Sequence, residues 1–476
     1  MRTPLRRLSL AVIAAVLVAG GLIDRTVDDA SDGQPVGQLA PVPMAAPESA
    51  RSSAWYCSGA TANPGGVADG TVVVANTGVR ALTAAVTVFP SQGDIRARSV
   101  QVPPATRATV RLAEVAAAPH ASAVVELDGG GAVVELATTG PLGDSVAACA
   151  SSASNRWFFA EGVTTRDATE LLTLFNPFPE DAVVDFAFSS EEGQSTPQAL
   201  TGLAVRGRSM SVVNVGDFVQ RREGVASRIS ARTGRLVVHR LQTYDGSAGR
   251  SGASVTLGSA DVGDVWYFPE GLVGDGRGER FQVFNPSPDE AEVELTLSLD
   301  TGEAEPLRIT VPRESRVTVD AANEGRIPKG VGHAVTVRAT NGVGVVVERT
   351  IQGGAPSPRT GISHTPGGRL TGLRWASAAG QADDAVDEWV VVHNPGPAVA
   401  SFSVGVLVDG TQAAPAGLQD LQVEPGRRRA VRLVDSIRRP ATPVVVTATQ
   451  PVVVERDLYR ARGPGISMGM AVPLRS

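Results

Sequence analysis

Short stretches of alternating apolar and polar residues run through the chain from residue 51 to its end. In one part they read "RFQVFN", "AEVELTLSL", "PLRITV", "SRVTVDA", "HAVTVRAT" and "VGVVVERTI", rich in Val, Ile, Thr and Phe. Turn signals such as "NPSPDE" and "TNGVG" separate them. A period of two with β-branched residues is typical of strands that bury one face. The pattern predicts an all-β protein with no helix after residue 23.

The same order of landmarks occurs four times. Each copy opens on a tryptophan, continues to an asparagine that ends an apolar run, and closes on a second apolar run. The tryptophans are Trp55, Trp157, Trp266 and Trp375, and the asparagines are Asn76, Asn176, Asn285 and Asn394. The closing runs are centred on Glu135, His239, Glu348 and Glu455. Landmarks that keep their order through four copies indicate a fourfold repeat.

The repeat predicts four units, here called units 1 to 4, which span residues 51–153, 154–262, 263–371 and 372–476. Roughly six to eight short strands per hundred residues are typical of an antiparallel β-sandwich of immunoglobulin type. The alternative is a β-propeller to which each unit supplies two blades. We favour four tandem immunoglobulin-like sandwiches. Asn-Pro, which occurs in units 2 to 4, is expected to end a strand, because proline cannot donate to a ladder.

The amino terminus has the form of an export signal. Basic residues in "MRTPLRR" precede the apolar run "LSLAVIAAVLVAGGLI", so residues 1–23 are predicted to be a signal peptide or an uncleaved membrane anchor. Residues 24–50, rich in Asp, Ala, Pro and Gly, are predicted to be a flexible linker. We expect the protein to be extracytoplasmic, secreted or tethered to the cytoplasmic membrane through this segment alone. A net charge of −6 argues against a nucleic-acid binder.

The two cysteines, Cys57 and Cys149, lie in unit 1. In an exported chain such a pair favours a disulfide that closes the unit on itself. A redox or metal pair is the alternative, although neither a CxxC spacing nor neighbouring histidines support it.

Charged residues recur with the repeat. Glu170, Glu279 and Glu388 precede the landmark asparagines, Glu161 and Glu270 follow two of the tryptophans, and Arg240, Arg349 and Arg456 end the closing runs. One hypothesis is a carboxylate site at a domain joint, for calcium or for acid–base chemistry. We favour an internal Glu–Arg bridge that staples strand ends, since these residues recur with the scaffold. We take as candidate joint or ligand residues Glu161, Glu170, Glu270, Glu279, Arg349 and Arg456.

Other chemistry has little support in the sequence. The histidines lie apart without metal-ligand spacing, and no phosphate-binding loop, dinucleotide fingerprint or nucleophile elbow is present. We therefore name no catalytic residue, metal ligand or cofactor. Unit 4 carries a group of arginines, which either faces an acidic envelope polymer or membrane head groups or forms a solvated strand edge; we favour the strand edge. These residues are Arg427, Arg428, Arg429, Arg432, Arg438 and Arg439.

The segments "WYC", "WFFAEG", "LTLFNP" and "VVVER" together resemble an uncharacterised actinobacterial exported family, the domain of unknown function 5719. The resemblance covers most of residues 51–476. It implies a location in the cell envelope and contributes no catalytic residues.

We expect an exported, non-catalytic binding or scaffolding protein of the cell envelope, whose partner is an envelope protein or glycan. The alternative is an envelope polysaccharide-binding or -processing enzyme with a carboxylate site at a domain joint. Substitution of Glu170 and Glu279 by glutamine separates the two, since a structural role predicts lost stability and an active site predicts a folded but inert protein.

Overall fold

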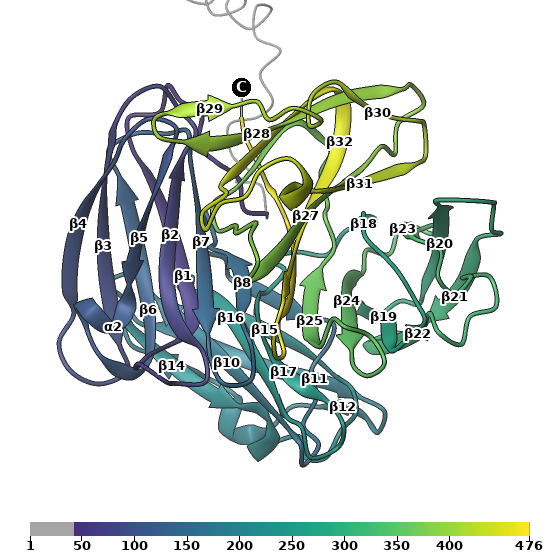
Figure 1. Ribbon diagram of the computed structural model, residues 1–476. Helices are drawn as coiled ribbons and strands as arrows, with labels where there is room; N and C mark the ends of the chain where they lie inside the picture. Colours follow the sequence, from purple (N-terminus) through teal and green to yellow (C-terminus); the bar gives the residue numbers. More distant parts are fainter. Residues whose placement is uncertain (1–41, 476) are drawn as a thin grey trace, which may run out of the picture. The chain divides into compact units, whose positions relative to one another are not determined.

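A computed structural model describes residues 42–475, which lie within one compact unit, Pro41–Ser476. Over these residues the chain is almost entirely β (Figure 1). One short helix, α2 (Leu112–Val115), and three 3-10 turns, η1 (Gln198–Leu200), η2 (Val215–Asp217) and η3 (Leu433–Asp435), interrupt the strands. The predicted signal or anchor, 1–23, and most of the predicted linker lie outside the described residues. Among the described helices, none is long and apolar enough to cross a membrane.

Unit 3 shows the architecture of a repeat most plainly. Its strands form two four-stranded antiparallel sheets, β18–β23–β20–β21 and β22–β19–β24–β25. Their bounds are β18 (Val265–Phe268), β19 (Arg277–Asn285), β20 (Ala291–Leu299), β21 (Leu307–Val311), β22 (Ser315–Asp320), β23 (His333–Ala339), β24 (Val346–Gly353) and β25 (Gly361–Pro366). Apolar side chains from both sheets, including Trp266, Phe281, Val293 and Val337, pack between them.

Units 1 and 2 repeat this strand order. Unit 1 contains β1 (Ser53–Ala62), β2 (Asp69–Asn76), β3 (Leu82–Pro90), β4 (Arg96–Val102), β5 (Thr106–Arg111), β6 (Ala118–Leu127), β7 (Ala132–Thr139) and β8 (Ser145–Ala148). Unit 2 contains β9 (Arg156–Phe159), β10 (Ala168–Asn176), β11 (Ala182–Ser190), β12 (Gly193–Ser195), β13 (Leu203–Val205), β14 (Ser209–Asn214), β15 (Val225–Thr233), β16 (Val237–Asp245) and β17 (Ser251–Leu257).

Unit 4 follows the same plan, with one long strand shared by its two sheets. Strand β32 (Val444–Arg460) pairs with β26 and β28 through its first part and with β27 and β33 through its second. The other strands are β26 (Gly372–Ser377), β27 (Val386–His393), β28 (Ala400–Val408), β29 (Thr411–Ala413), β30 (Leu421–Val423), β31 (Arg428–Arg432), β33 (Ile466–Met470) and β34 (Val472–Pro473).

The predicted fold class, four tandem immunoglobulin-like β-sandwiches, is confirmed. The propeller alternative is not what the described residues form. In units 2 and 3 the strands form two separate sheets, in unit 1 the two sheets are joined only by one parallel pair between β1 and β2, and in unit 4 they share β32. The prediction that no helix follows residue 23 is wrong only for α2, which is a single turn after β5.

The landmark asparagines stabilise the turns that follow their strands, and the landmark tryptophans lie in the cores. Asn176 ends β10, and its side-chain amide donates to the carbonyls of Glu180 at 2.8 Å and Val205 at 3.1 Å. Its oxygen accepts the Phe178 amide, which fixes the turn that follows. Asn76, Asn285 and Asn394 make the equivalent bonds. The opening tryptophans are buried in the cores of their units.

The predicted disulfide is present and joins Cys57 in β1 to Cys149, just beyond β8. In units 2 and 3 the equivalent pair is a phenylalanine lying against a glycine. A Cβ on Gly258 would lie 2.8 Å from the Phe159 ring, and one on Gly367 would lie 2.7 Å from the Phe268 ring. The disulfide of unit 1 and the phenylalanine–glycine contacts of units 2 and 3 therefore occupy the same place in the repeat. One joins the strands covalently and the others join them by apolar packing. The disulfide also indicates an oxidising compartment.

The four units form a closed ring, because unit 4 contacts unit 1. In Figure 1 they follow one another round the picture, with β8, β17 and β25 toward its middle. One strand from each unit lies there, and β8, β17, β25 and β33 contact one another in cyclic order. At each step a serine of one unit accepts a backbone N–H of the next. The pairs are Val255 to Ser145 at 2.9 Å, His364 to Ser254 at 3.0 Å, Met468 to Ser363 at 3.0 Å, and Val146 to Ser467 at 2.8 Å.

The segment 42–50, which was predicted to be part of the flexible linker, lies across the junction of units 4 and 1. Ala45 forms a parallel bridge with Leu474 and donates to the Pro473 carbonyl at 3.1 Å. Gly131 of unit 1 donates to Ala46 at 2.9 Å. The linker prediction is therefore wrong for these residues, because their backbone groups form hydrogen bonds with both unit 4 and unit 1.

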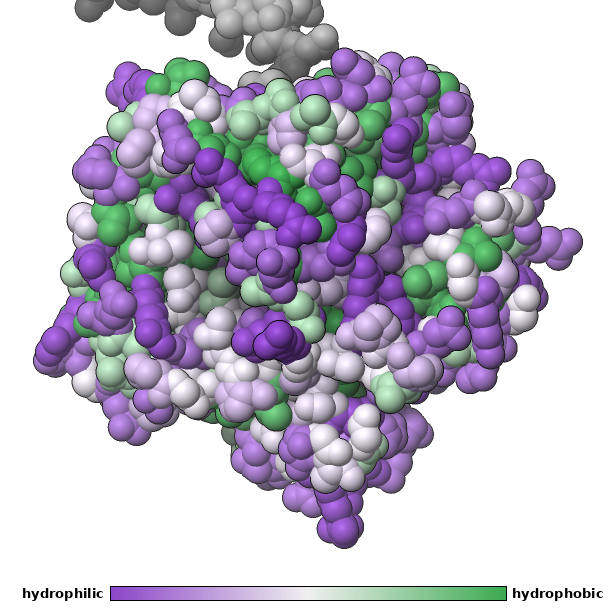
Figure 2. Space-filling view, in the orientation of Figure 1, coloured by the Kyte–Doolittle hydropathy of each residue, from purple (hydrophilic) through white to green (hydrophobic). Residues whose placement is uncertain are grey.

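Hydrophilic side chains predominate on the face shown in Figure 2, and hydrophobic ones gather in its upper part.

The disulfide is expected to stabilise unit 1 strongly. The crosslink spans 92 residues, and loop closure of that length is worth at most about 4–5 kcal/mol. A C57A/C149A variant should therefore melt well below the parent protein under oxidising conditions, as thermal unfolding measures. Reduction of the parent should lower its melting temperature to that of the variant. An unchanged melting temperature on reduction would contradict this role.

Candidate functional site

The closing arginines and glutamates meet between units. Arg240 of unit 2 pairs with Glu348 of unit 3 at 2.6 Å. Arg349 of unit 3 pairs with Glu455 of unit 4, and Arg456 of unit 4 pairs with Glu135 of unit 1 at 2.8 Å. All six side chains are buried. The same bridge therefore recurs at the 2/3, 3/4 and 4/1 joints, each time from one unit to the next.

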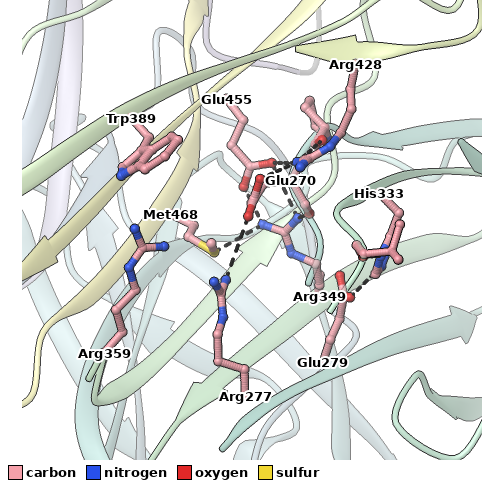
Figure 3. A network of polar contacts seen from close by, with 12 residues as sticks. Glu270, Arg277, Glu279, His333, Arg349, Arg359, Trp389, Arg428, Glu455 and Met468 are labelled. Atoms are coloured by element: carbon pink, nitrogen blue, oxygen red, sulfur yellow. Dashed lines mark hydrogen bonds and ion pairs between the residues drawn. The ribbon is translucent and has the colours of Figure 1, made fainter. Parts of the chain in front are cut away.

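Each bridge also holds the backbone after the opening tryptophan. At the 2/3 joint the Ala160 amide donates to Glu348 at 2.8 Å, and Arg240 donates to the Glu161 carbonyl. At the 3/4 joint the Glu270 amide donates to Glu455 at 3.1 Å (Figure 3). Because both charges are hydrogen-bonded on several sides, their burial is compensated.

The inner sheet of each unit is the one that contains its central strand, β8, β17, β25 or β33. At the 2/3 and 3/4 joints a second arginine reaches across from the edge strand of the inner sheet. Arg316 in β22 pairs with Glu161, and Arg428 in β31 pairs with Glu270 (Figure 3). Arg428 also pairs with Asp300 at 2.8 Å. These arginines belong to the later unit and the glutamates to the earlier one. Two crossing ion pairs therefore tie unit 2 to unit 3 and unit 3 to unit 4.

The 4/1 joint keeps only the first of these pairs. Ala379 stands where the other joints have Glu161 and Glu270, and Glu135 accepts both the Ala378 amide at 2.9 Å and the Ala379 amide at 2.6 Å. The edge-strand arginine of unit 1, Arg107, donates to the carbonyls of Gly380 at 2.9 Å and Pro440 at 3.3 Å.

The 1/2 joint has no Arg–Glu bridge of this kind among residues 42–475. Leu136 stands for the arginine and His239 for the glutamate. Burial lowers the pKa of His239 to about 4, so the ring is neutral. Its Nε2 donates to the Ala148 carbonyl at 3.3 Å, and its Nδ1 accepts the Ser58 hydroxyl at 2.8 Å. A Cβ on Gly59 would approach His239 to 3.0 Å, so the two strands pack closely.

The glutamates before the landmark asparagines have a different partner in each unit. Glu279 accepts from His333 at 2.7 Å, and Glu388 accepts from the Thr442 hydroxyl. Unit 2 has Val225 at the equivalent place, and neither oxygen of Glu170 has a hydrogen-bond partner among the described residues. Glu170 therefore carries an uncompensated buried carboxyl group.

Burial shifts these carboxyl groups toward the neutral form. Burial raises the pKa of Glu170 to about 8, although the nearby Arg240 lowers it. Burial likewise raises the pKa of Glu161 to about 7 and that of Glu388 to about 7, against the lowering effect of nearby arginines. Such values suit a general acid. Glu170 and Glu388 are 0% exposed and Glu161 is 5% exposed, so a substrate has no access to them in this structure.

All six candidate residues taken from the sequence lie at or beside the joints. The structure corrects the favoured interpretation in one respect, since the Glu–Arg bridges link neighbouring units rather than strand ends within a unit. The calcium interpretation finds no support in residues 42–475, which contain no group of three or more acidic, histidine or cysteine side chains placed to hold a metal ion. Glu161 and Glu270 face arginines and not oxygen ligands.

The arginine group of unit 4 does not form a free basic patch. Arg428 is buried in the 3/4 joint, and Arg427 donates to the Leu299 carbonyl of unit 3 at 2.7 Å. Three others pair with acidic residues of unit 4: Arg432 with Asp387, Arg438 with Asp384 and Arg439 with Asp409. The favoured prediction of a solvated strand edge is therefore wrong for Arg428, which instead belongs to a joint.

A cavity of about 120 Å³ lies where the four units meet. Its walls come from β8, β17, β25, β33 and the segments that follow them, and Val42 and Pro43 lie at one side. Trp266 and Trp375 line it, and its titratable lining residues are Glu135, His364, Arg369 and Arg456. A mostly apolar cavity of this size accommodates at most a molecule of about the size of benzene.

Two groups of joint residues were missed in the sequence. The edge-strand arginines Arg107 and Arg316 stand equally far beyond Asn76 and Asn285, which is a detectable signal. The serines that accept a backbone N–H of the next unit include Ser145, Ser254 and Ser363, which stand equally far before the next opening tryptophan. Small polar residues are common near strand ends, so this spacing alone predicts no role.

The joint bridges are expected to be coupled pairs. R349L leaves Glu455 buried without its partner and should destabilise the protein by about 3–5 kcal/mol. The double variant R349L/E455L removes both charges, so it should lose much less than the sum of the single losses. A double-mutant cycle of urea unfolding measures this coupling. Additive losses would show that the two side chains do not interact.

The unpartnered Glu170 predicts a pH dependence. Its folded pKa, about 8, lies above the ordinary value of 4.5, so the native state holds the proton more tightly. Its contribution to stability is full below pH 4.5 and falls as the pH rises toward 8, by about 1.4 kcal/mol per pH unit. Since glutamine imitates the protonated form, E170Q should melt above the parent at pH 8 and close to it at pH 4.5, which reverses the loss of stability expected from the sequence.

E279Q is the matched control in unit 3. Glu279 and its hydrogen bond raise the pKa of His333 and outweigh the opposing effect of burial. That stabilisation is full below pH 6.5 and is lost as the pH rises through the raised value, so E279Q should melt below the parent at pH 6. If E170Q also melts below the parent at pH 8, the description of Glu170 as unpartnered is wrong.

Comparison with known proteins gives a family match to part of the chain and no function. No curated protein matches the sequence. The crystal structure of Thermotoga maritima 1070 is 16% identical, covers 23% of this chain and 95% of its own, and has a TM-score of 0.21. A tetra-tandem repeat in the extending region of a large adhesion protein is 12% identical, covers 88% and 99% of the two chains, and has a TM-score of 0.11. Neither similarity carries an argument at these scores. The model of "Family of unknown function (DUF5719)" matches residues 130–350, from the last strands of unit 1 into β24 of unit 3, so the family resemblance found in the sequence is confirmed over this part of the chain.

Proposed function

We propose that the protein is an exported, non-catalytic scaffolding or binding protein of the cell envelope. One observation carries the proposal: the carboxylates that recur with the repeat are buried, and those at the 2/3, 3/4 and 4/1 joints are engaged with arginines of neighbouring units. Joints built in this way hold four sandwiches in a fixed relation, which suits the presentation of loops and edges to a partner.

The location rests on two features. A basic segment followed by an apolar run opens the sequence, as in secretory signals and anchors. The Cys57–Cys149 disulfide belongs to an oxidising compartment. We propose that the protein acts outside the cytoplasm, either secreted or held at the membrane by its amino terminus, and that its partner is an envelope protein or glycan.

A polysaccharide-processing enzyme needs carboxylates that reach the substrate. Glu170 and Glu279 are 0% exposed, and Glu161 and Glu270 are paired with Arg316 and Arg428. No contact in the described residues favours this alternative, so we propose no catalytic residue.

The proposal is tested by crosslinking the exported protein in cells and by incubating the purified protein with envelope polysaccharide. We expect a reproducible envelope protein or glycan to be captured, and we expect no new reducing ends from the polysaccharide. As a control, E161Q/E270Q should change the melting temperature without changing any release of sugar. Release that disappears in this variant, while the variant remains folded, would establish the enzyme instead.

A further inference from the structure

We infer that the 4/1 joint holds a binding site for a small carboxylate on a hydroxylated frame, the chemistry of an acidic monosaccharide, with Arg107 as its anchor. This inference rests on the proposed binding role and adds the class of ligand. It follows from a comparison of equivalent places in the ring.

At two joints the chain supplies its own carboxylate to the edge-strand arginine. Arg316 has Glu161 and Arg428 has Glu270. At the 4/1 joint the arginine is kept and the glutamate is replaced by Ala379. The carboxylate that the 2/3 and 3/4 joints place against this guanidinium is therefore absent, while the arginine remains.

The guanidinium of Arg107 is only partly engaged. Its contacts are two backbone carbonyls, Gly380 and Pro440, and among residues 42–475 no carboxylate forms an ion pair with it. A guanidinium offers five N–H donors, so donors remain for a ligand. Burial lowers the pKa of Arg107 and outweighs the opposing charges of Glu388 and Glu135. For Arg428, the charges of Glu270 and Asp300 outweigh burial and raise the pKa.

A cavity of about 260 Å³ lies beside this arginine. Its floor is one face of the inner sheet of unit 1, where alternate residues of β2, β5 and β7 point the same way. These are Thr71, Val73, Arg107, Thr109, Ala137 and Thr139. Residues of unit 4, among them Ala379, Gly380 and Gln381, form the opposite wall. Thr109 and Thr139 are exposed, so the cavity opens to solvent.

The lining matches an acidic sugar better than an apolar molecule. Arginine binds carboxylates through two parallel N–H donors, and the hydroxyls of Thr71 and Thr109 and the amide of Gln381 suit the hydroxyl groups of a sugar. The cavity also contains Arg460 and Asp144, which pair with each other at 3.1 Å. Arg107 therefore leaves the lining with one net positive charge. Drug-sized sites begin at about 300 Å³, so a monosaccharide is the appropriate size.

Calorimetric titration of the full exported chain with D-glucuronate tests the site, with D-glucose and inorganic phosphate as comparisons. We expect saturable binding of glucuronate and at least tenfold weaker binding of the other two. No binding of glucuronate, equal binding of glucose, or equal binding of phosphate would each overturn the inference.

Two variants place the ligand at Arg107. A379E restores the glutamate of the other joints, so it should occupy the guanidinium, weaken glucuronate binding at least tenfold and raise the melting temperature. R107Q should weaken binding to the same degree, and it decides the matter if A379E does not fold. R316Q is the matched control at the 2/3 joint and should leave glucuronate binding unchanged.

Binding that persists in folded A379E or in R107Q would contradict the assignment to this cavity. Failure here is distinguishable from failure of the proposed function. A captured envelope partner without glucuronate binding would remove only the ligand class, and glucuronate binding without any captured partner would leave the site but not the scaffolding role.

Discussion

The buried arginine–glutamate bridge between neighbouring units is the interaction on which the rest of the structure depends. Each sandwich has its own core and could in principle form part of an open row. The bridge changes that, because every arginine at the end of a closing strand finds its carboxylate on the next unit, and Arg456 finds Glu135 back on the first. Charges that are costly to bury alone thereby favour one closed arrangement of the four units.

The joints are similar but not identical, and their differences are informative. The 1/2 joint has Leu136 and His239 in place of the arginine and the glutamate, and its strands pack closely at Gly59. One of its two units, unit 1, also contains the disulfide. The 2/3 and 3/4 joints carry two crossing ion pairs. The 4/1 joint keeps one and leaves Arg107 facing an open cavity. Structural roles are therefore shared by all the units, and the best place for a specific function is where the pattern is broken.

Much of the fold followed from local patterns. Alternation gave the strands, the asparagines gave the turns, and the cysteine pair gave the disulfide. The partners at the joints did not follow. Arg240 and Glu348 are about one repeat apart, so recurrence alone does not distinguish a bridge within a unit from one between units. Closure rests on Arg456 and Glu135, which are separated by 321 residues, and local periodicity carries no information at that distance.

Small-angle X-ray scattering of the exported chain tests the closed ring most directly. A compact body of the length of Pro41–Ser476 has a radius of gyration of about 22 Å. The account predicts a value near this for the parent protein, with an increase when the Arg456–Glu135 bridge is removed together with residues 42–50. A radius of gyration of about twice that value in the parent, as expected for four sandwiches in an open row, would contradict it.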